Sequence, residues 1–218
     1  MARNGYASTV LVSTQWVAEH ISDPRVVMAE VDENPDLYDA GHIPGAVKLH
    51  WRDDLQDPVE RDLVSKAEFE RLLCERGIGI DTSLVLYGDK HNWFAAYAYW
   101  YVKIYGHADV RIMDGGRQKW IDEGRALTAI THEPIRVSYR TRDRDESIRA
   151  YRDQVLYWMG TPGHALVDVR SPGEFAGELA APPGYEREGA QRATSRPRRR
   201  SPGLRRSATM APSGRRTS

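Results

Sequence analysis

The chain has 218 residues, with 31 basic and 31 acidic side chains and a formal net charge of zero. An apolar content of 40% with six Trp and eleven Tyr is typical of a globular protein, and the mean hydropathy of −0.61 excludes a membrane protein. The single cysteine, Cys74, excludes an internal disulfide and a zinc cluster, and because the N-terminus has no signal-peptide pattern we expect a cytoplasmic protein.

Helix and strand patterns alternate along the first half of the chain. In chain order they predict a helix over 13–20, strands at 25–31 and 47–49, a helix over 65–76, a strand at 83–87, a helix from 93, a strand at 110–113 and a helix over 117–123. Ser13 and Ser65 are placed to cap the first two helices, and Gly77 to end the second. This alternation predicts an α/β domain with a parallel sheet flanked by helices.

The loop over 88–92 lies between the most apolar strand and an aromatic helix. Backbone N–H groups of such a loop can form an anion cradle, which becomes catalytic when a nucleophile begins the loop. The loop begins with glycine, and its second residue, Asp89, would repel an anion. The candidates for an anion-binding loop are Gly88, Lys90, His91 and Asn92.

Two reactive side chains elsewhere are expected to be structural. His42 lies in the segment GHIPGA (41–46), where a histidine between Gly41 and Ile43 more often fixes a loop by hydrogen bonding than acts in catalysis. Cys74 falls near the C-terminal end of its helix, where the helix dipole disfavours a thiolate. We therefore predict no metal site.

The first domain, over 8–130, is followed by a partial repeat. Residues 131–147 are charged and poor in apolar side chains, which indicates a linker. Beyond it we expect a helix at 150–155 and a strand at 165–170, and residues 167–170 align with 29–32. The second copy, over 148–193, is incomplete, because the sequence after Phe175 drifts into Pro, Gly and charge. An uncovered strand there predicts poor solubility or proteolysis beyond about residue 130.

The last segment, 194–218, is a basic tail. It contains eight Arg and no Asp, Glu or Lys, so the first 193 residues carry 23 basic and 31 acidic side chains, a net charge of −8. One Leu and one Met are its only sizeable apolar residues, and we expect it to be disordered. Because it has no aromatic residue for base stacking, we expect no nucleic-acid partner.

Four segments in this order resemble the two-domain rhodaneses, the thiosulfate sulfurtransferases: GHIPGA at 41–46, NWFAAYAYW at 92–100, MDGGRQKW at 113–120 and LVDVRSPGEF at 166–175. The resemblance covers residues 8 to about 193. It implies two similar rhodanese-like domains, a catalytically silent first one and a second with a cysteine at the start of its strand-to-helix loop. In the family that cysteine takes sulfur from thiosulfate as a persulfide and passes it to cyanide or another thiophile, without a metal or organic cofactor.

The chain departs from this pattern at the reactive position. Gly88 occupies the cysteine position of the silent domain, and no cysteine follows Cys74. We therefore expect no catalytic residue in this chain. The loop over 88–92 is then either an anion- or partner-binding module or, as we favour, a structural remnant.

We attribute the tail to a frameshift. The second copy should contain a His-Ile-Pro segment like that of the first, and the codons CAC ATC CCG read one base later begin with Thr-Ser-Arg. The chain has Thr194, Ser195 and Arg196 at this point. The other reading frames of the gene should then encode a further strand, a loop beginning with cysteine and a helix.

Overall fold

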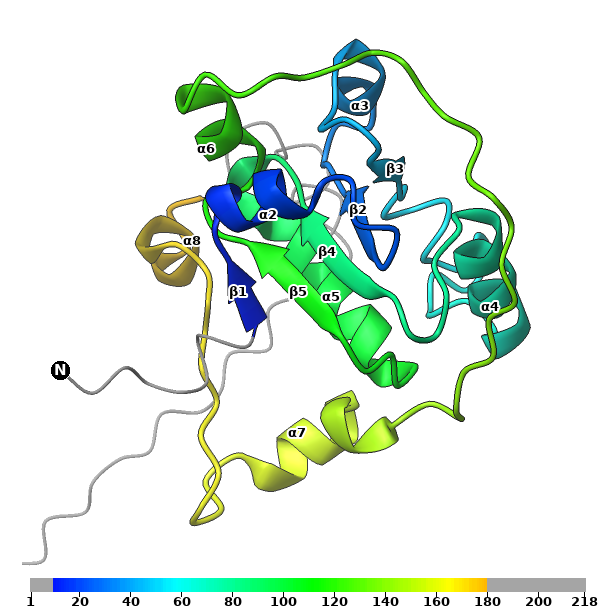
Figure 1. The fold of residues 1–218 in the computed structure, drawn as a ribbon. Helices are drawn as coiled ribbons and strands as arrows, with labels where there is room; N and C mark the ends of the chain where they lie inside the picture. The colour runs from blue at the N-terminus through cyan, green and yellow to red at the C-terminus, as the bar shows by residue number, and fades with distance from the viewer. Residues whose placement is uncertain (1–9, 180–218) are drawn as a thin grey trace, which may run out of the picture. The chain divides into compact units, whose positions relative to one another are not determined.

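The computed structural model describes residues 10–179 of the chain (Figure 1). The predicted tail over 194–218, the frameshift position and the last part of the predicted second copy lie outside these residues. The chain divides into two units after Val155, and each is treated by itself.

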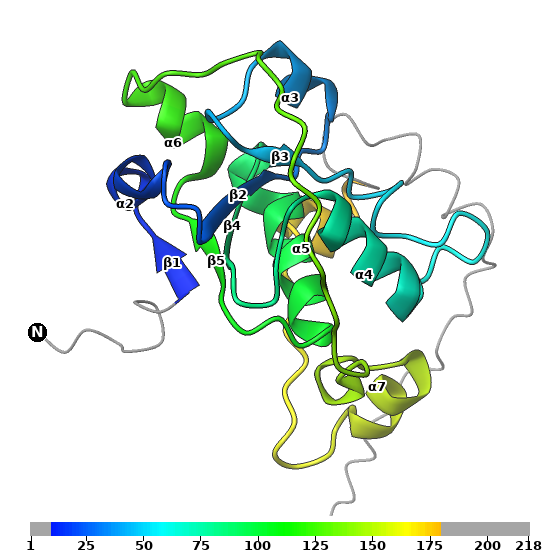
Figure 2. The same ribbon diagram turned by 45° about the vertical axis from the view of Figure 1, so that its right-hand side comes forward.

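A five-stranded parallel sheet forms the centre of the first unit, with the strand order β1-β5-β4-β2-β3 (Figures 1 and 2). The strands are β1 Leu11–Val12, β2 Val26–Glu30, β3 Val47–Lys48, β4 Ser83–Tyr87 and β5 Val110–Met113. The central strand β4 is buried from Leu84 onward. Burial on both faces explains why its sequence is continuously apolar rather than alternating.

Helices cover both faces of this sheet. The first unit contains α2 Thr14–His20, α3 Asp36–Ala40, α4 Lys66–Glu75, the 3-10 turn η1 Lys90–Asn92, α5 Trp93–Ile104, α6 Gly116–Asp122 and the 3-10 turn η2 Glu146–Ile148. Two further helices are α7 Arg152–Trp158, which runs across the division, and α8 Pro172–Ala176 in the second unit. The predicted parallel α/β architecture is confirmed.

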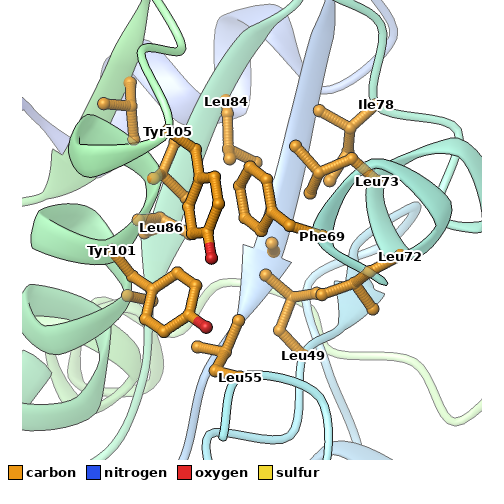
Figure 3. Close-up of a cluster of buried hydrophobic side chains, with 14 of the residues drawn as sticks. Leu49, Leu55, Phe69, Leu72, Leu73, Ile78, Leu84, Leu86, Tyr101 and Tyr105 are labelled. Carbon is orange, nitrogen blue, oxygen red and sulfur yellow. The ribbon is translucent and has the colours of Figure 1, made fainter. Parts of the chain in front are cut away.

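Two apolar cores lie on opposite faces of the sheet. Leu84 and Leu86 point into a core formed with α4 and α5, in which the rings of Phe69 and Tyr105 stack 4.1 Å apart (Figure 3). Val85 and Tyr87 point into a second core, formed with α2, α3 and α6. This division follows from the strand geometry, because successive side chains of a strand leave opposite faces of a sheet.

The predicted helix caps are confirmed. Ser13 Oγ accepts a hydrogen bond from Trp16 N at 3.0 Å. Ser65 and Glu68 form a capping box, in which Ser65 N donates to Glu68 Oε2 at 2.8 Å and Glu68 N donates to Ser65 Oγ at 3.3 Å. These bonds satisfy N–H groups that have no partner inside the helix.

The predicted linker, 131–147, belongs to the first unit and packs on its α4 side. Residues 131–145 have no helix or strand, yet Tyr139 is buried and its hydroxyl contacts His107 Nδ1 at 3.0 Å. Thr141 N donates to Glu70 Oε1 at 2.9 Å, and Val137 N donates to the Cys74 carbonyl at 3.3 Å. Because these contacts hold the segment on α4, we now expect proteolysis to begin after the first unit rather than near residue 130.

The predicted strand at 165–170 is wrong. These residues have no regular secondary structure, and Leu166, Val167 and Val169 are largely exposed. A strand forms only where a neighbour takes up its N–H and C=O groups, and the described part of the second unit contains no other strand. Helix α8 does form, capped by Ser171 and Glu174.

Candidate functional site

The loop over 88–92 follows β4 in the chain, and its hydrogen bonds connect the ends of the neighbouring strands β4 and β5. Gly88 N donates to Asn92 Oδ1 at 3.0 Å, and Asn92 Nδ2 donates to the Met113 carbonyl at 2.7 Å. Arg117 N donates to the Gly88 carbonyl at 2.9 Å. Asn92 therefore ties the end of β4 to the end of β5 at the carboxyl edge of the sheet, where the sequence predicts the loop.

The turn that makes this loop is left-handed. Lys90, His91 and Asn92 have φ values of 47°, 56° and 67°, a conformation that non-glycine residues adopt rarely. The side chains of Lys90 and His91 are exposed, whereas Asn92 is buried. The bonds of Asn92 to both strands stabilise the strained turn.

Most backbone N–H groups of the predicted anion cradle already donate hydrogen bonds to other groups of the protein. Asp89 N donates to Asp32 Oδ1 at 2.8 Å, and Asn92 N donates to the Asp89 carbonyl at 2.9 Å. Together with the Gly88 N–H, these groups are not available to an anion. The carboxylate of Asp89, within the loop itself, accepts a hydrogen bond from Glu33 N at 2.7 Å and places a negative charge where an anion would bind.

Gly88 lies directly against the backbone of Val31, the residue that follows β2. A Cβ added at this position would lie 2.1 Å from the Val31 carbonyl oxygen and 2.9 Å from its carbon, far inside van der Waals contact. Neither atom can move without breaking the sheet, because Val31 N donates to the Tyr87 carbonyl at 2.8 Å. The structure therefore has no room at this position for a side chain, cysteine included.

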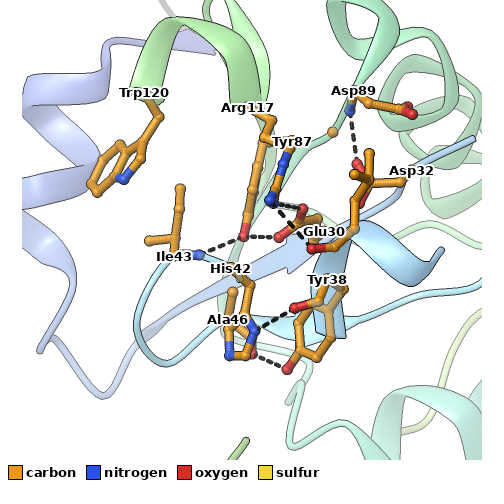
Figure 4. Close-up of polar contacts among 12 residues, drawn as sticks. Glu30, Asp32, Tyr38, His42, Ile43, Ala46, Tyr87, Asp89, Arg117 and Trp120 are labelled. Carbon is orange, nitrogen blue, oxygen red and sulfur yellow. Dashed lines mark hydrogen bonds and ion pairs between the residues drawn. The ribbon is translucent and has the colours of Figure 1, made fainter. Parts of the chain in front are cut away.

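A buried polar network lies beside the loop (Figure 4). The guanidinium of Arg117 forms an ion pair with Glu30 Oε1 and donates to the Leu37 carbonyl at 3.2 Å. Tyr87 Oη donates to Glu30 Oε2 and accepts from Ile43 N at 3.0 Å. The network joins α6, β2, β4 and the loop after α3. Arg117 follows the glycines of the segment DGGR (114–117), but no local pattern shows its partner.

Asp32 is the second carboxylate of this region. It is 3% exposed, and its Oδ2 has no hydrogen-bond partner among the described residues. Burial, followed by the nearby Glu30 charge, raises the pKa of Asp32 to about 8. Below that pH the Asp32 carboxyl is mostly neutral, which reduces the repulsion between Asp32 and Glu30.

His42 and Cys74 occupy structural positions. His42 is fully buried, its ring stacks on Tyr38 with centroids 3.9 Å apart, and its Nδ1 contacts the Tyr38 carbonyl at 2.9 Å. His42 and Thr128 also exchange two backbone hydrogen bonds of 2.8 Å. Cys74 is half-buried in the last turn of α4. The hydrogen bonds of His42 confirm its predicted role in the loop, whereas for Cys74 the structure confirms the position near the end of α4 and the structural role stays a prediction.

Residues 10–179 contain neither a metal-binding cluster nor a helix suited to span a membrane. No group of three or more His, Cys, Asp or Glu side chains there is arranged to hold a metal ion. Within the same range, no helix combines the length and the apolar character needed to span a membrane.

The strand order and the loop after the central strand define the class of this domain, the rhodanese fold. The Rhodanese-like domain family matches residues 13–123, and the chain belongs to that family. A solved 3-mercaptopyruvate sulfotransferase, SseA of Escherichia coli, has a similar fold, with a TM-score of 0.69 and 23% identity. The likeness covers 79% of this chain and 70% of that one.

Two sequence relatives are more closely similar. The sulfur carrier protein TtuD of Thermus thermophilus is 55% identical over 193 residues, which cover 87% of this chain and 68% of TtuD. A Saccharopolyspora erythraea protein named "Putative thiosulfate sulfurtransferase" is 53% identical over 184 residues, which cover 84% of this chain and 65% of that protein. The chain spans about two thirds of the length of these relatives.

We predict that Asp32→Asn makes the stability of the first unit less dependent on pH. Because the pKa of Asp32 is raised from 3.8 to about 8 on folding, its contribution is present at low pH and is lost as the pH rises toward 8. The free energy of unfolding should fall by at most about 4 kcal/mol between pH 5 and pH 8, at 1.36 kcal/mol per unit for one proton. In the variant this fall should disappear.

Urea unfolding of both proteins between pH 5 and pH 9, followed by Trp fluorescence, measures this difference. The exposed Asp81 provides the control, and Asp81→Asn should keep the pH profile of the unaltered chain. Parallel profiles for the Asp32 variant and the unaltered chain would show that Asp32 is ionised in the folded state.

Proposed function

We propose that this chain is a non-catalytic rhodanese-like domain of the thiosulfate sulfurtransferase lineage. In the intact family the activity transfers sulfane sulfur from thiosulfate to cyanide or another thiophile through a cysteine persulfide. The observation that carries the proposal is Gly88, where the Val31 carbonyl fills the space that a nucleophilic side chain would need. The names of the two relatives, a sulfur carrier and a thiosulfate sulfurtransferase, support the substrate class.

The chemistry explains why this domain is inactive by itself. A thiolate attacks the outer sulfur of thiosulfate, a new S–S bond forms, and the old one breaks as sulfite leaves with its electron pair. Cyanide then attacks the outer sulfur of the persulfide, releasing thiocyanate and restoring the thiolate. Without a covalent carrier the reaction cannot be divided into these two steps. Cys74 is a poor substitute, because it lies half-buried at the C-terminal end of α4.

Thiocyanate formation from thiosulfate and cyanide tests the proposal. We expect the full chain to be no faster than its Cys74→Ala variant, and neither to exceed the reaction without protein. The intact Saccharopolyspora erythraea relative serves as the positive control. Turnover by this chain that disappears in Cys74→Ala would overturn the proposal and make Cys74 the nucleophile.

The second candidate is anion binding by the loop over 88–92. The exposed basic side chains of Lys90 and His91 favour it, whereas the Asp89 carboxylate and the engaged amides oppose it. Thiosulfate or sulfate titration, followed by the amide NMR signals of the loop, tests it. We expect no saturable shift in the millimolar range, and a saturable shift that Lys90→Ala removes would establish the anion site. We also propose a cytoplasmic location, because a single cysteine suits a reducing compartment, and no nucleic-acid partner, because residues 194–218 contain no aromatic residue for base stacking.

A further inference from the structure

The segment over residues 131–145, termed here the strap, runs along the first unit past α4 to η2 (Figures 1 and 2). It contains no helix or strand. Tyr139 and Thr141 are 2% and 9% exposed, whereas Ser138 and Arg140 beside them are exposed. An extended chain places successive side chains on opposite sides, so the strap turns one row of side chains inward.

Two buried side chains anchor the strap. The ring of Tyr139 packs edge-on against Phe69 of α4, with centroids 6.1 Å apart, and its hydroxyl lies 3.0 Å from Nδ1 of His107. Thr141 Oγ1 donates to the Tyr105 carbonyl at the end of α5. The strap is therefore attached through a few specific contacts rather than through a broad apolar surface.

The strap also forms ion pairs at the surface, which contribute little to its attachment. Arg140 lies 2.9 Å from Glu70, and Lys66 lies 2.9 Å from Asp143. Hydrogen bonds from Thr141 N and from Lys66 keep the pKa values of Glu70 and Asp143 below their usual range. Neither carboxylate therefore takes up a proton between pH 7.5 and pH 5.5.

The hydrogen bond between Tyr139 and His107 depends on the protonation of the imidazole. Nε2 of His107 lies 2.9 Å from the Thr82 carbonyl, and because a carbonyl only accepts, Nε2 carries the ring proton. Nδ1 then accepts from the Tyr139 hydroxyl, whose only hydrogen-bond partner among residues 10–179 is His107. The Tyr139 hydroxyl can therefore donate only to an uncharged His107.

A second proton on His107 is unfavourable while the strap is in place. Burial lowers the pKa of His107 below 6.5, an effect that the Thr82 carbonyl and the Asp109 charge oppose and that the Lys103 charge increases. With a proton on Nδ1, the Tyr139 hydroxyl would have to accept instead of donate. Its own proton would then be buried without an acceptor.

We propose that His107 and Tyr139 form a pH-dependent latch, in which protonation of His107 breaks their hydrogen bond and releases the strap from α4. In the released form His107 meets water and takes up a proton with a pKa of about 6.5. The closed form is therefore most favoured above pH 6.5, and it becomes less favoured below that pH by up to about tenfold per pH unit. Release uncovers Cys74, which lines a hollow of about 230 Å³ together with Ser138 and Tyr139 of the strap.

Hydrogen exchange of the full chain at pH 7.5 and pH 5.5 tests the latch. The reporting amides are Val137 N, which donates to the Cys74 carbonyl at 3.3 Å, and Asp145 N, which donates to the Ile104 carbonyl at 2.8 Å. Corrected for the intrinsic rate at each pH, their protection should be at least about fivefold lower at pH 5.5. The amides of β4 should stay better protected at both pH values, because the sheet remains closed. Equal protection of strap and sheet would overturn a local release.

The matched variants compare two histidines. His107→Gln retains an amide that can donate to the Thr82 carbonyl but cannot become charged, so its strap protection should change by less than about twofold between the two pH values. His132→Gln replaces an exposed histidine of the strap itself and should keep the pH dependence of the unaltered chain. The same pH dependence in both variants would overturn the latch.

NMR of the His107 ring in the unaltered chain gives a test that needs no variant to fold. At pH 7.5 the ring nitrogen shifts should identify the neutral form with its proton on Nε2. On acidification the imidazolium signals should appear together with those of the released strap. Protonation of His107 while the amide signals of Val137 and Asp145 stay unchanged would overturn the latch, and so would loss of strap protection while His107 stays neutral.

Thiol labelling measures the consequence of release. Cys74 is the only cysteine of the chain, so its reaction with a pyridyl disulfide reports whether the hollow is uncovered. Relative to a cysteine peptide at the same pH, the rate should rise at least about threefold from pH 7.5 to pH 5.5 in the unaltered chain and in His132→Gln, but not in His107→Gln. A constant relative rate in all three proteins would overturn the release of the strap.

Discussion

Gly88→Ala is expected to destabilise the first unit by more than about 3 kcal/mol, a loss typical of severe overpacking. The added Cβ would lie 2.1 Å from the Val31 carbonyl oxygen, and the nearest obstacle is backbone rather than a movable side chain. Relief requires separating the ends of β2 and β4, which are joined by the Val31 to Tyr87 hydrogen bond. Urea unfolding followed by Trp fluorescence measures the loss.

Gly124→Ala is the matched control for this prediction. Gly124 has a φ of +68° and no atom within 4 Å of an added Cβ, so its substitution introduces backbone strain without a clash. It should cost about 1 kcal/mol. Equal losses in the two variants would show that the space at Gly88 opens readily. In that case Gly88→Cys would become a reasonable route to an active first domain.

Glu30→Gln is expected to destabilise the first unit by about 3–5 kcal/mol, the range for a buried ion pair that loses one partner. The substitution keeps the shape of the side chain but leaves the guanidinium of Arg117 buried without a counter-charge. The side chain of Glu30 is fully buried and that of Arg117 is 10% exposed, so water cannot replace the lost partner. Chemical unfolding at neutral pH measures the effect.

A double-mutant cycle separates the interaction energy between Glu30 and Arg117 from the other effects of each substitution. Arg117→Met in the Glu30→Gln background removes the unpaired charge and should recover part of the loss. The exposed pair of Asp39 and Lys48, 2.7 Å apart, is the control, and Asp39→Asn should cost less than about 1 kcal/mol. Additive losses in the Glu30 and Arg117 cycle would contradict a coupled buried pair.

Local patterns predict most of the elements in the first unit. Strand β4 is recognisable because it is buried on both faces, and α4 because Ser65 and Glu68 form a capping box in a four-residue window. Strand β1 is not predicted, since two residues are too short to show a period. The strand at 165–170 is predicted wrongly, because its pattern is local but its pairing depends on strands elsewhere.

The candidate site is predictable only in its position. A loop after the central strand of a parallel sheet must lie at the carboxyl edge, and Gly88 to Asn92 do lie there. The hydrogen-bond and charge partners in and beside the loop are residues far away in the chain. Asp32 is 57 positions from Asp89, and Glu30 is 87 positions from Arg117, and no period in the sequence relates them.

The sequence by itself determined the family, the alternation of helices and strands, and the absence of any cysteine other than Cys74. These properties follow from local patterns and from residue identity, which need no knowledge of contacts. Only the tertiary structure decided that the Val31 carbonyl fills the space beside Gly88 and that Glu30 is paired with Arg117. Steric exclusion and charge pairing depend on distances between atoms that are far apart in the sequence and come together only when the chain folds.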